Sequence, residues 1–242
     1  MDTLEESPSL RDVSGPIDDL ALTLPVFLGY HLGVAFLPVR NAADLVTHEL
    51  VRFAENSLAG YIALTVILGL GYAAVLLVLG REQHLRWERF ALVLFEGILY
   101  AVAMRLVAGY VIGKMSLAAV DEAATPLAAL VTSLGAGFYE ELVFRVLGFG
   151  LGLKLVYLLF ATQGRARRFA AGLAWALVTA LVFSGWHYVG EFGDPFELRS
   201  FVFRAVCGLV FVAIYALRGF APVVWTHALY DIWVLVLPGF LS

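Results

Sequence analysis

The segment Leu58–Leu79 runs for 22 residues without a charged side chain. A helix of about 20 apolar residues is long enough to cross the hydrocarbon core of a bilayer. Inside lipid the backbone polar groups have no water to bond, so only a helix or a closed barrel spans it. The segment therefore predicts a transmembrane helix, and it makes the bilayer the solvent in which the rest of the chain folds.

Other apolar segments of similar length follow the same pattern. Hydrophobic residues make up 61% of the 242 residues, against about 45–50% in soluble domains. This composition predicts an all-α, polytopic transmembrane helix bundle with about seven spans. Eight spans are the alternative if 126–160, about 50 Å long as a helix, turns back at Gly148, Gly150 and Gly152. The other predicted spans are 20–39, 90–112, 169–189, 200–217 and 222–241.

Charge divides the chain into three parts. Residues 1–19 hold six acidic side chains and one arginine, which excludes a secretory signal, because such a signal begins with positive charge. This acidic tail precedes the N-terminal transmembrane helices of 20–125 and a second helical part, 126–242, that holds the polar motifs. The net charge of −4 gives no basis for binding nucleic acid. Eight basic residues on the N-terminal side against four on the other place the N-terminus in the cytoplasm.

Two adjacent carboxylates and an arginine lie near the middle of the apolar run 126–160. Each costs about 2.5–3.5 kcal/mol at membrane depth, so such residues are functional candidates by default. Glu141 and Arg145 are four residues apart, and on a helix they share a face and can pair. Glu140 points about 100° away and lacks this partner. Glu140 is therefore the candidate for chemistry.

Two further pairs share the same spacing: Phe183 with His187, and His227 with Asp231. Hydrolysis needs a base that activates water and donors that stabilise the oxyanion. Glu140 fits the base, and His187 can hold the same water or shuttle its proton. His227 can donate to the tetrahedral oxygen, while Asp231 orients it or shares that role.

Two alternatives remain open from the residues alone. Glu140, His187 and His227 can instead be three ligands of a zinc ion with water in the fourth position. The chain can also be a non-catalytic transporter or scaffold with a buried polar network, although no inverted repeat supports a transporter. The sequence holds no His-Glu-x-x-His, Gly-x-Ser-x-Gly or Gly-Lys-Ser/Thr motif, which excludes the usual zincins, serine hydrolases and P-loop enzymes.

The three motifs, in this order, resemble those of the CAAX-processing and bacteriocin-processing (CPBP, or Abi) family of intramembrane endopeptidases. These are Glu-Glu-x-x-x-Arg, Phe-x-x-x-His and His-x-x-x-Asn/Asp, and the resemblance covers about residues 126–235. It implies that 126–242 is a catalytic core in which no metal is required, with zinc as the alternative. The implied roles are water activation by Glu140 and His187, an oxyanion site of His227 and Asp231, and support from Glu141, Arg145 and Phe183.

Two positions depart from the family pattern. Asp231 stands where prenyl proteases usually have asparagine, and an ionised aspartate cannot donate to an oxyanion. It must be protonated or act by polarising His227. Val146 follows Arg145 where glycine is frequent, so we expect a substrate choice different from that of the prenyl proteases.

The resemblance implies an integral membrane protease, CAAX-prenyl-protease-2-like, that cuts a peptide bond near the membrane-associated C-terminus of a protein or peptide. Its partners are then membrane lipids and that substrate. The chain length and the missing eukaryotic features favour a prokaryotic inner membrane protein in protein sorting or peptide maturation over CAAX trimming.

Straight helices that cross the whole membrane would not bring the three motifs together. Drawn straight, the spans place Glu140 and His187 roughly 25–35 Å above one membrane face but His227 only about 8 Å above it. We expect the three to meet, with 200–217 short or tilted, or with 188–199 dipping into the membrane.

Overall fold

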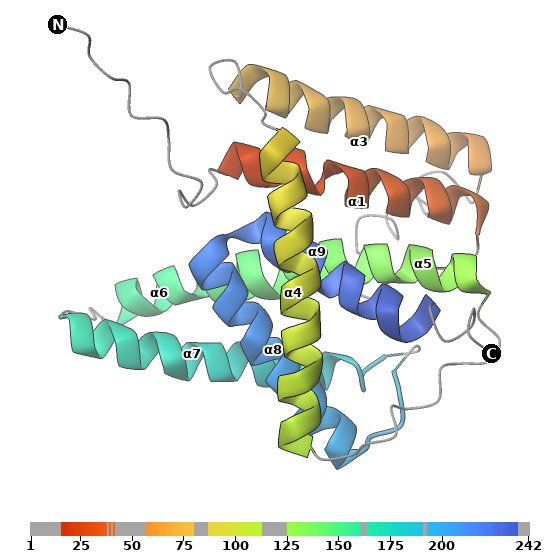
Figure 1. Cartoon of the computed structure of the whole chain (residues 1–242). Coiled ribbons are helices and arrows are strands. Elements are labelled where there is room, and N and C mark those ends of the chain that lie inside the picture. The colour runs from red at the N-terminus through yellow and green to blue at the C-terminus, as the bar shows by residue number, and fades with distance from the viewer. Residues whose placement is uncertain are drawn as a thin grey trace, which may run out of the picture.

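The computed structural model describes residues 16–37, 39, 41, 57–79, 87–112, 125–160, 164–190 and 193–236. Regular structure in these ranges is entirely helical, which confirms the predicted all-α bundle (Figure 1). The elements are α1 (Pro16–Phe36), α3 (Leu58–Leu79), α4 (Trp87–Ile112), α5 (Pro126–Gly135), the π-helical η1 (Ala136–Glu140) and η2 (Leu142–Leu151), α6 (Gly152–Leu159), α7 (Arg165–Trp186), α8 (Leu198–Arg218), α9 (Phe220–Asp231) and the π-helical η3 (Ile232–Val236).

Six of the described helical runs are long and apolar enough to cross a membrane. They correspond to six predicted spans, and the seventh, 222–241, is the shorter apolar run Phe220–Val236. On α3 the side chains of Ile67 and Leu70 are each 64% exposed. Such an apolar outer surface suits contact with lipid, so the fold is that of a polytopic helical membrane protein.

The first helix begins earlier than predicted. α1 starts at Pro16, so it includes the last four residues of the expected 1–19 tail, while residues 1–15 lie outside the described part. Asp19 is buried, and its carboxylate accepts the backbone N–H of Phe220 at 2.7 Å. This bond satisfies a donor at the start of α9 and ties it to α1. Of residues 41–56, which follow the first predicted span, only Asn41 is described.

The long run from Pro126 to Leu159 does not turn back, so the eight-span alternative does not occur. In Figure 1 α5 and α6 follow one course across the bundle. The glycines expected to bend it instead admit aromatic side chains. A Cβ on Gly152 would lie 2.8 Å from the Trp175 ring, and the Trp175 indole N–H donates to the carbonyl of Gly148 at 3.0 Å. These glycines therefore serve packing against α7.

The π-helical turns η1 and η2 lie on either side of Glu141. Such turns are rare and are found frequently at functional sites. A Cβ on Gly137, within η1, would lie 2.9 Å from both the amide nitrogen of Ala228 and the carbonyl oxygen of Val224. The absence of a side chain therefore lets the α9 backbone lie directly against the turn that ends in Glu140.

α9 occupies the centre of the bundle, where it contacts α1, α4, α5 and α8. Ala221, Val223, Val224 and Ala228 on this helix are completely buried. α8 is 21 residues long and runs obliquely to α7 in Figure 1. The 200–217 segment is therefore oblique rather than short.

Candidate active site

The buried pair Glu141 and Arg145 forms the base of the site. Arg145 Nε lies 2.9 Å from Glu141 Oε2, as the i, i+4 spacing predicts, and both side chains are almost completely buried. The guanidinium lies over the rings of Phe183, at 4.2 Å, and Phe211, at 4.9 Å. The motif phenylalanine therefore covers the arginine, and the charge is enclosed rather than left open to substrate.

The same carboxylate also orients His227. Glu141 Oε1 lies 2.6 Å from His227 Nδ1. Because a carboxylate accepts, the imidazole carries a proton on Nδ1 and directs Nε2 away from Glu141. The ring stacks on Phe211 at 4.5 Å between centroids. Glu141 thus has an ion-pair partner at one oxygen and a hydrogen-bond partner at the other, and its role is support.

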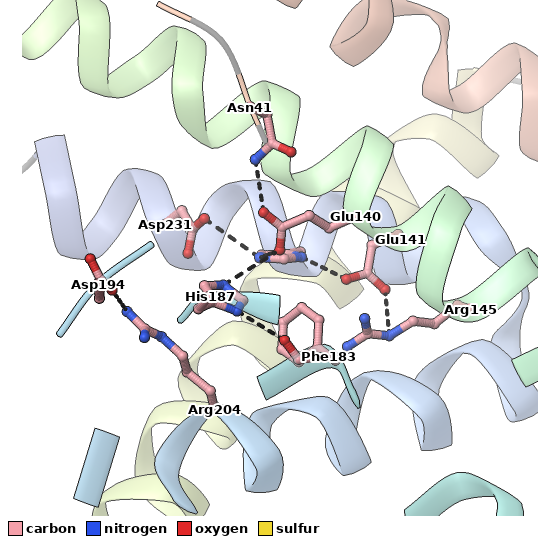
Figure 2. Close-up of polar contacts among 10 residues, drawn as sticks. Asn41, Glu140, Glu141, Arg145, Phe183, His187, Asp194, Arg204 and Asp231 are labelled. Carbon is pink, nitrogen blue, oxygen red and sulfur yellow. Dashed lines mark hydrogen bonds and ion pairs between the residues drawn. The ribbon is translucent and has the colours of Figure 1, made fainter. Parts of the chain in front are cut away.

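Glu140 has a different environment (Figure 2). Its Oε1 accepts the side-chain N–H of Asn41 at 2.8 Å. Its Oε2 faces two imidazoles, 3.8 Å from Nε2 of His187 and 4.0 Å from Nε2 of His227. Oε2 is buried and makes no hydrogen bond within the part of the chain that the structure describes. One carboxylate oxygen is therefore held, and the other faces the site.

His187 stands at the end of α7 with its ring aimed at Glu140. Its Nδ1 lies 2.9 Å from the carbonyl oxygen of Phe183. A carbonyl only accepts, so the proton is on Nδ1, and the Nε2 lone pair of the neutral ring faces Glu140. The motif Phe183 thus acts twice, through its ring on Arg145 and through its carbonyl on His187.

Asp231 lies one helical turn after His227, with Oδ2 at 3.5 Å from Nε2 of His227. That separation is long for a hydrogen bond. Nε2 of His227 also faces Glu140, so Asp231 and Glu140 lie near the same nitrogen atom. The four residues predicted for chemistry, Glu140, His187, His227 and Asp231, therefore lie around one point, although they come from three separate helical runs.

The site is more open on one side than on the other. The side chains of His187 and Asp231 are 24% and 22% exposed, whereas Glu140 and His227 are 8% and 6% exposed. On the His187 side, Arg204 pairs with Asp194 at 2.5 Å, and the Asp194 backbone N–H donates to the His187 carbonyl. These contacts hold the described end of the connection to α8 beside the more open side.

Zinc binding by Glu140, His187 and His227 stays a prediction. No group of three or more His, Cys, Asp or Glu side chains among the described residues has the arrangement that a metal ion needs. Glu140, His187 and His227 are the nearest such set, with Oε2 of Glu140 3.8 and 4.0 Å from the two imidazole nitrogens.

Two residues at the site were not identified from the sequence. Asn41 follows the first span and contacts Glu140 across 99 residues of chain. Phe211 is one apolar side chain among many in α8, yet it stacks on both His227 and Arg145. A single amide next to a predicted span end was the only available signal for Asn41, and none existed for Phe211.

The fold and the site define a class: a polytopic helical membrane protein with a buried cluster of carboxylates and imidazoles. Residues 122–233, which contain all three motifs, match the family model described as type II CAAX prenyl endopeptidase Rce1-like. The match identifies residues 122–233 as a segment of the CPBP type, and it indicates a protease of the CAAX prenyl endopeptidase type. No curated protein and no solved structure matches the chain.

The two adjacent glutamates predict opposite effects on stability. Glu141→Gln leaves the buried Arg145 charge without its counter-ion and should destabilise the fold by about 3–5 kcal/mol. Glu140→Gln removes a carboxylate that has no cationic partner closer than the imidazoles and should leave stability nearly unchanged. Thermal unfolding in detergent compares the two. Equal losses for both variants would contradict the division between support and chemistry.

Proposed function

We propose that this protein is an intramembrane endopeptidase that hydrolyses a peptide bond near the membrane-associated C-terminus of a protein or peptide. The observation that carries the proposal is the state of Glu140, whose Oε2 is buried without a hydrogen bond among the described residues and faces two imidazole nitrogens. A network built only for stability would satisfy a buried carboxylate oxygen, because leaving it unpaired costs about 1–3 kcal/mol or more. This is our reason for setting aside a scaffold or a transporter.

The first step is water activation. A water bound beside Glu140 Oε2 gives one hydrogen bond to that oxygen and the other to Nε2 of His187, which leaves its lone pair for the scissile carbonyl carbon. Glu140 takes the proton as the oxygen–carbon bond forms. Low exposure keeps bulk water from competing for this oxygen.

The second step is charge stabilisation and collapse. The carbonyl oxygen becomes an oxyanion next to Nε2 of His227, which donates to it when the ring is doubly protonated. The carboxylate of Glu141, 2.6 Å from Nδ1 of that ring, supplies the negative charge that balances such an imidazolium. When the carbon–nitrogen bond breaks, the proton on Glu140 passes to the leaving amine. The products are a new carboxylate and a new amine, and Glu140 is restored.

The proposed mechanism is glutamic and needs no metal. The positive charge that a zinc ion would place at the oxyanion is supplied instead by His227, held by its bond to Glu141. We also propose a prokaryotic inner membrane protein. The distribution of basic residues supports a cytoplasmic N-terminus. Protein sorting or peptide maturation fits the Asp231 and Val146 departures better than CAAX trimming.

The proposal predicts that Glu140→Gln abolishes cleavage while a strong chelator leaves the wild type active. The assay mixes membrane-anchored peptides, including a prenylated CAAX peptide, with purified protein in detergent, and mass spectrometry identifies the products. The matched control is Thr23→Val, which replaces another buried polar side chain whose hydrogen bonds go to Asp19, Leu20 and Tyr72 and not to the cluster. Cleavage by the Glu140→Gln protein would contradict the site assignment. Loss of wild-type cleavage on chelation, restored by zinc, would establish the metal mechanism.

Asp231 provides a second test, because its two proposed roles respond differently to substitution. If it donates to the oxyanion, Asp231→Asn keeps a donor at all pH values and should retain activity within about threefold, whereas Asp231→Leu should lose about 10²–10³-fold. We expect this pattern, since Glu141 already orients His227. Equal loss in both variants would show that the negative charge itself is needed.

A further inference from the structure

The segment that follows α1 contributes a polar side chain to the candidate site, although it lies outside the family-matched residues 122–233. Asn41 is 9% exposed, and its side-chain N–H donates to Oε1 of Glu140 at 2.8 Å (Figure 2). Burying a carboxamide is costly unless it is hydrogen-bonded, and an apolar side chain would avoid that cost. The choice of an amide at this position therefore needs a reason beyond packing.

Asn41 is itself held by α1. Its backbone N–H donates to the hydroxyl of Tyr30 at 3.1 Å. The Tyr30 ring fits into a notch at Gly135, where a Cβ would approach it to 2.4 Å. One residue along α1, Nε2 of His31 lies 2.7 Å from the hydroxyl of Tyr139, the neighbour of Glu140. α1 is thus fixed on both sides of the turn that bears the glutamate.

We propose that Asn41 is a positioning residue for Glu140 and that the catalytic unit extends back to residue 41. The inference rests on the function proposed above. The carboxamide N–H can only donate, so the Oε1 atom that it contacts is an unprotonated oxygen. A proton that Glu140 takes from water is therefore directed to Oε2, the oxygen that faces His187 and His227. Without Asn41 the carboxylate rotates about its last torsion, and the proton is shared between both oxygens.

The test compares Asn41→Ala, the near-isosteric Asn41→Asp and the carboxamide-retaining Asn41→Gln with the wild type in the peptide cleavage assay. Loss of a partner that orients a reacting group costs about 10–100-fold in rate. We expect kcat to fall by that factor in the alanine and aspartate variants, with KM within twofold of the wild type, and Asn41→Gln to recover part of the loss. A residue that is only structural would lower the melting temperature instead and would not discriminate between aspartate and glutamine.

The matched control is Tyr72→Phe. It removes a hydrogen bond of 2.6 Å from the Tyr72 hydroxyl to the Leu20 carbonyl on α1, without touching Glu140. We expect kcat to stay within twofold of the wild type. If the Asn41→Ala protein unfolds, the kcat of the Asn41→Asp protein tests the inference. Wild-type kcat in a folded Asn41→Asp or Asn41→Ala protein would overturn the inference while leaving the proposed protease intact. Absence of any cleavage by the wild type would instead overturn the proposed function.

Discussion

The carboxylate of Glu141 is the contact on which the rest of the site depends. One oxygen lies 2.9 Å from Arg145 Nε and the other 2.6 Å from His227 Nδ1, and the side chain is completely buried. A charged arginine in that position is tolerable only with its counter-ion and with the aromatic rings that cover it. The same carboxylate orients His227. Glu141 therefore compensates the buried charge of Arg145 and also sets the geometry of the proposed oxyanion site.

The bilayer explains why these groups must gather in one place. Ionisable side chains at membrane depth are costly when they stand alone. Here the carboxylates and imidazoles of η1, α7 and α9 share one enclosed cluster, with α9 at the centre of the bundle. The glycine at 137 brings the α9 backbone against the turn that ends in Glu140. The close approach of the backbones and the contacts between ionisable side chains thus join the same two elements, η1 and α9.

Much of this arrangement was predictable from the sequence, and the reasons for the remainder are physical. Apolar length gave the spans, and the i, i+4 rule separated Glu141, which pairs with Arg145, from Glu140, which does not. Contacts between distant segments were not predictable. The bond from Asn41 to Glu140 joins residues 99 positions apart, and Asp19, read as part of a solvated tail, caps α9 across 201 positions. The alternative of a turn back at the glycines after Arg145 is wrong. The space that they leave for Trp175 and Tyr215 depends on other helices and was not predictable.

The central claim is that a water molecule, activated at Oε2 of Glu140, attacks the substrate directly. A single turnover in H₂¹⁸O with enzyme in excess over peptide tests it. Direct attack of water on the peptide predicts one ¹⁸O atom in the new carboxylate of the first product molecules and none in the protein. First-turnover product without the label, together with ¹⁸O in the carboxylate of Glu140, would show that the glutamate attacks the peptide itself and would contradict the account.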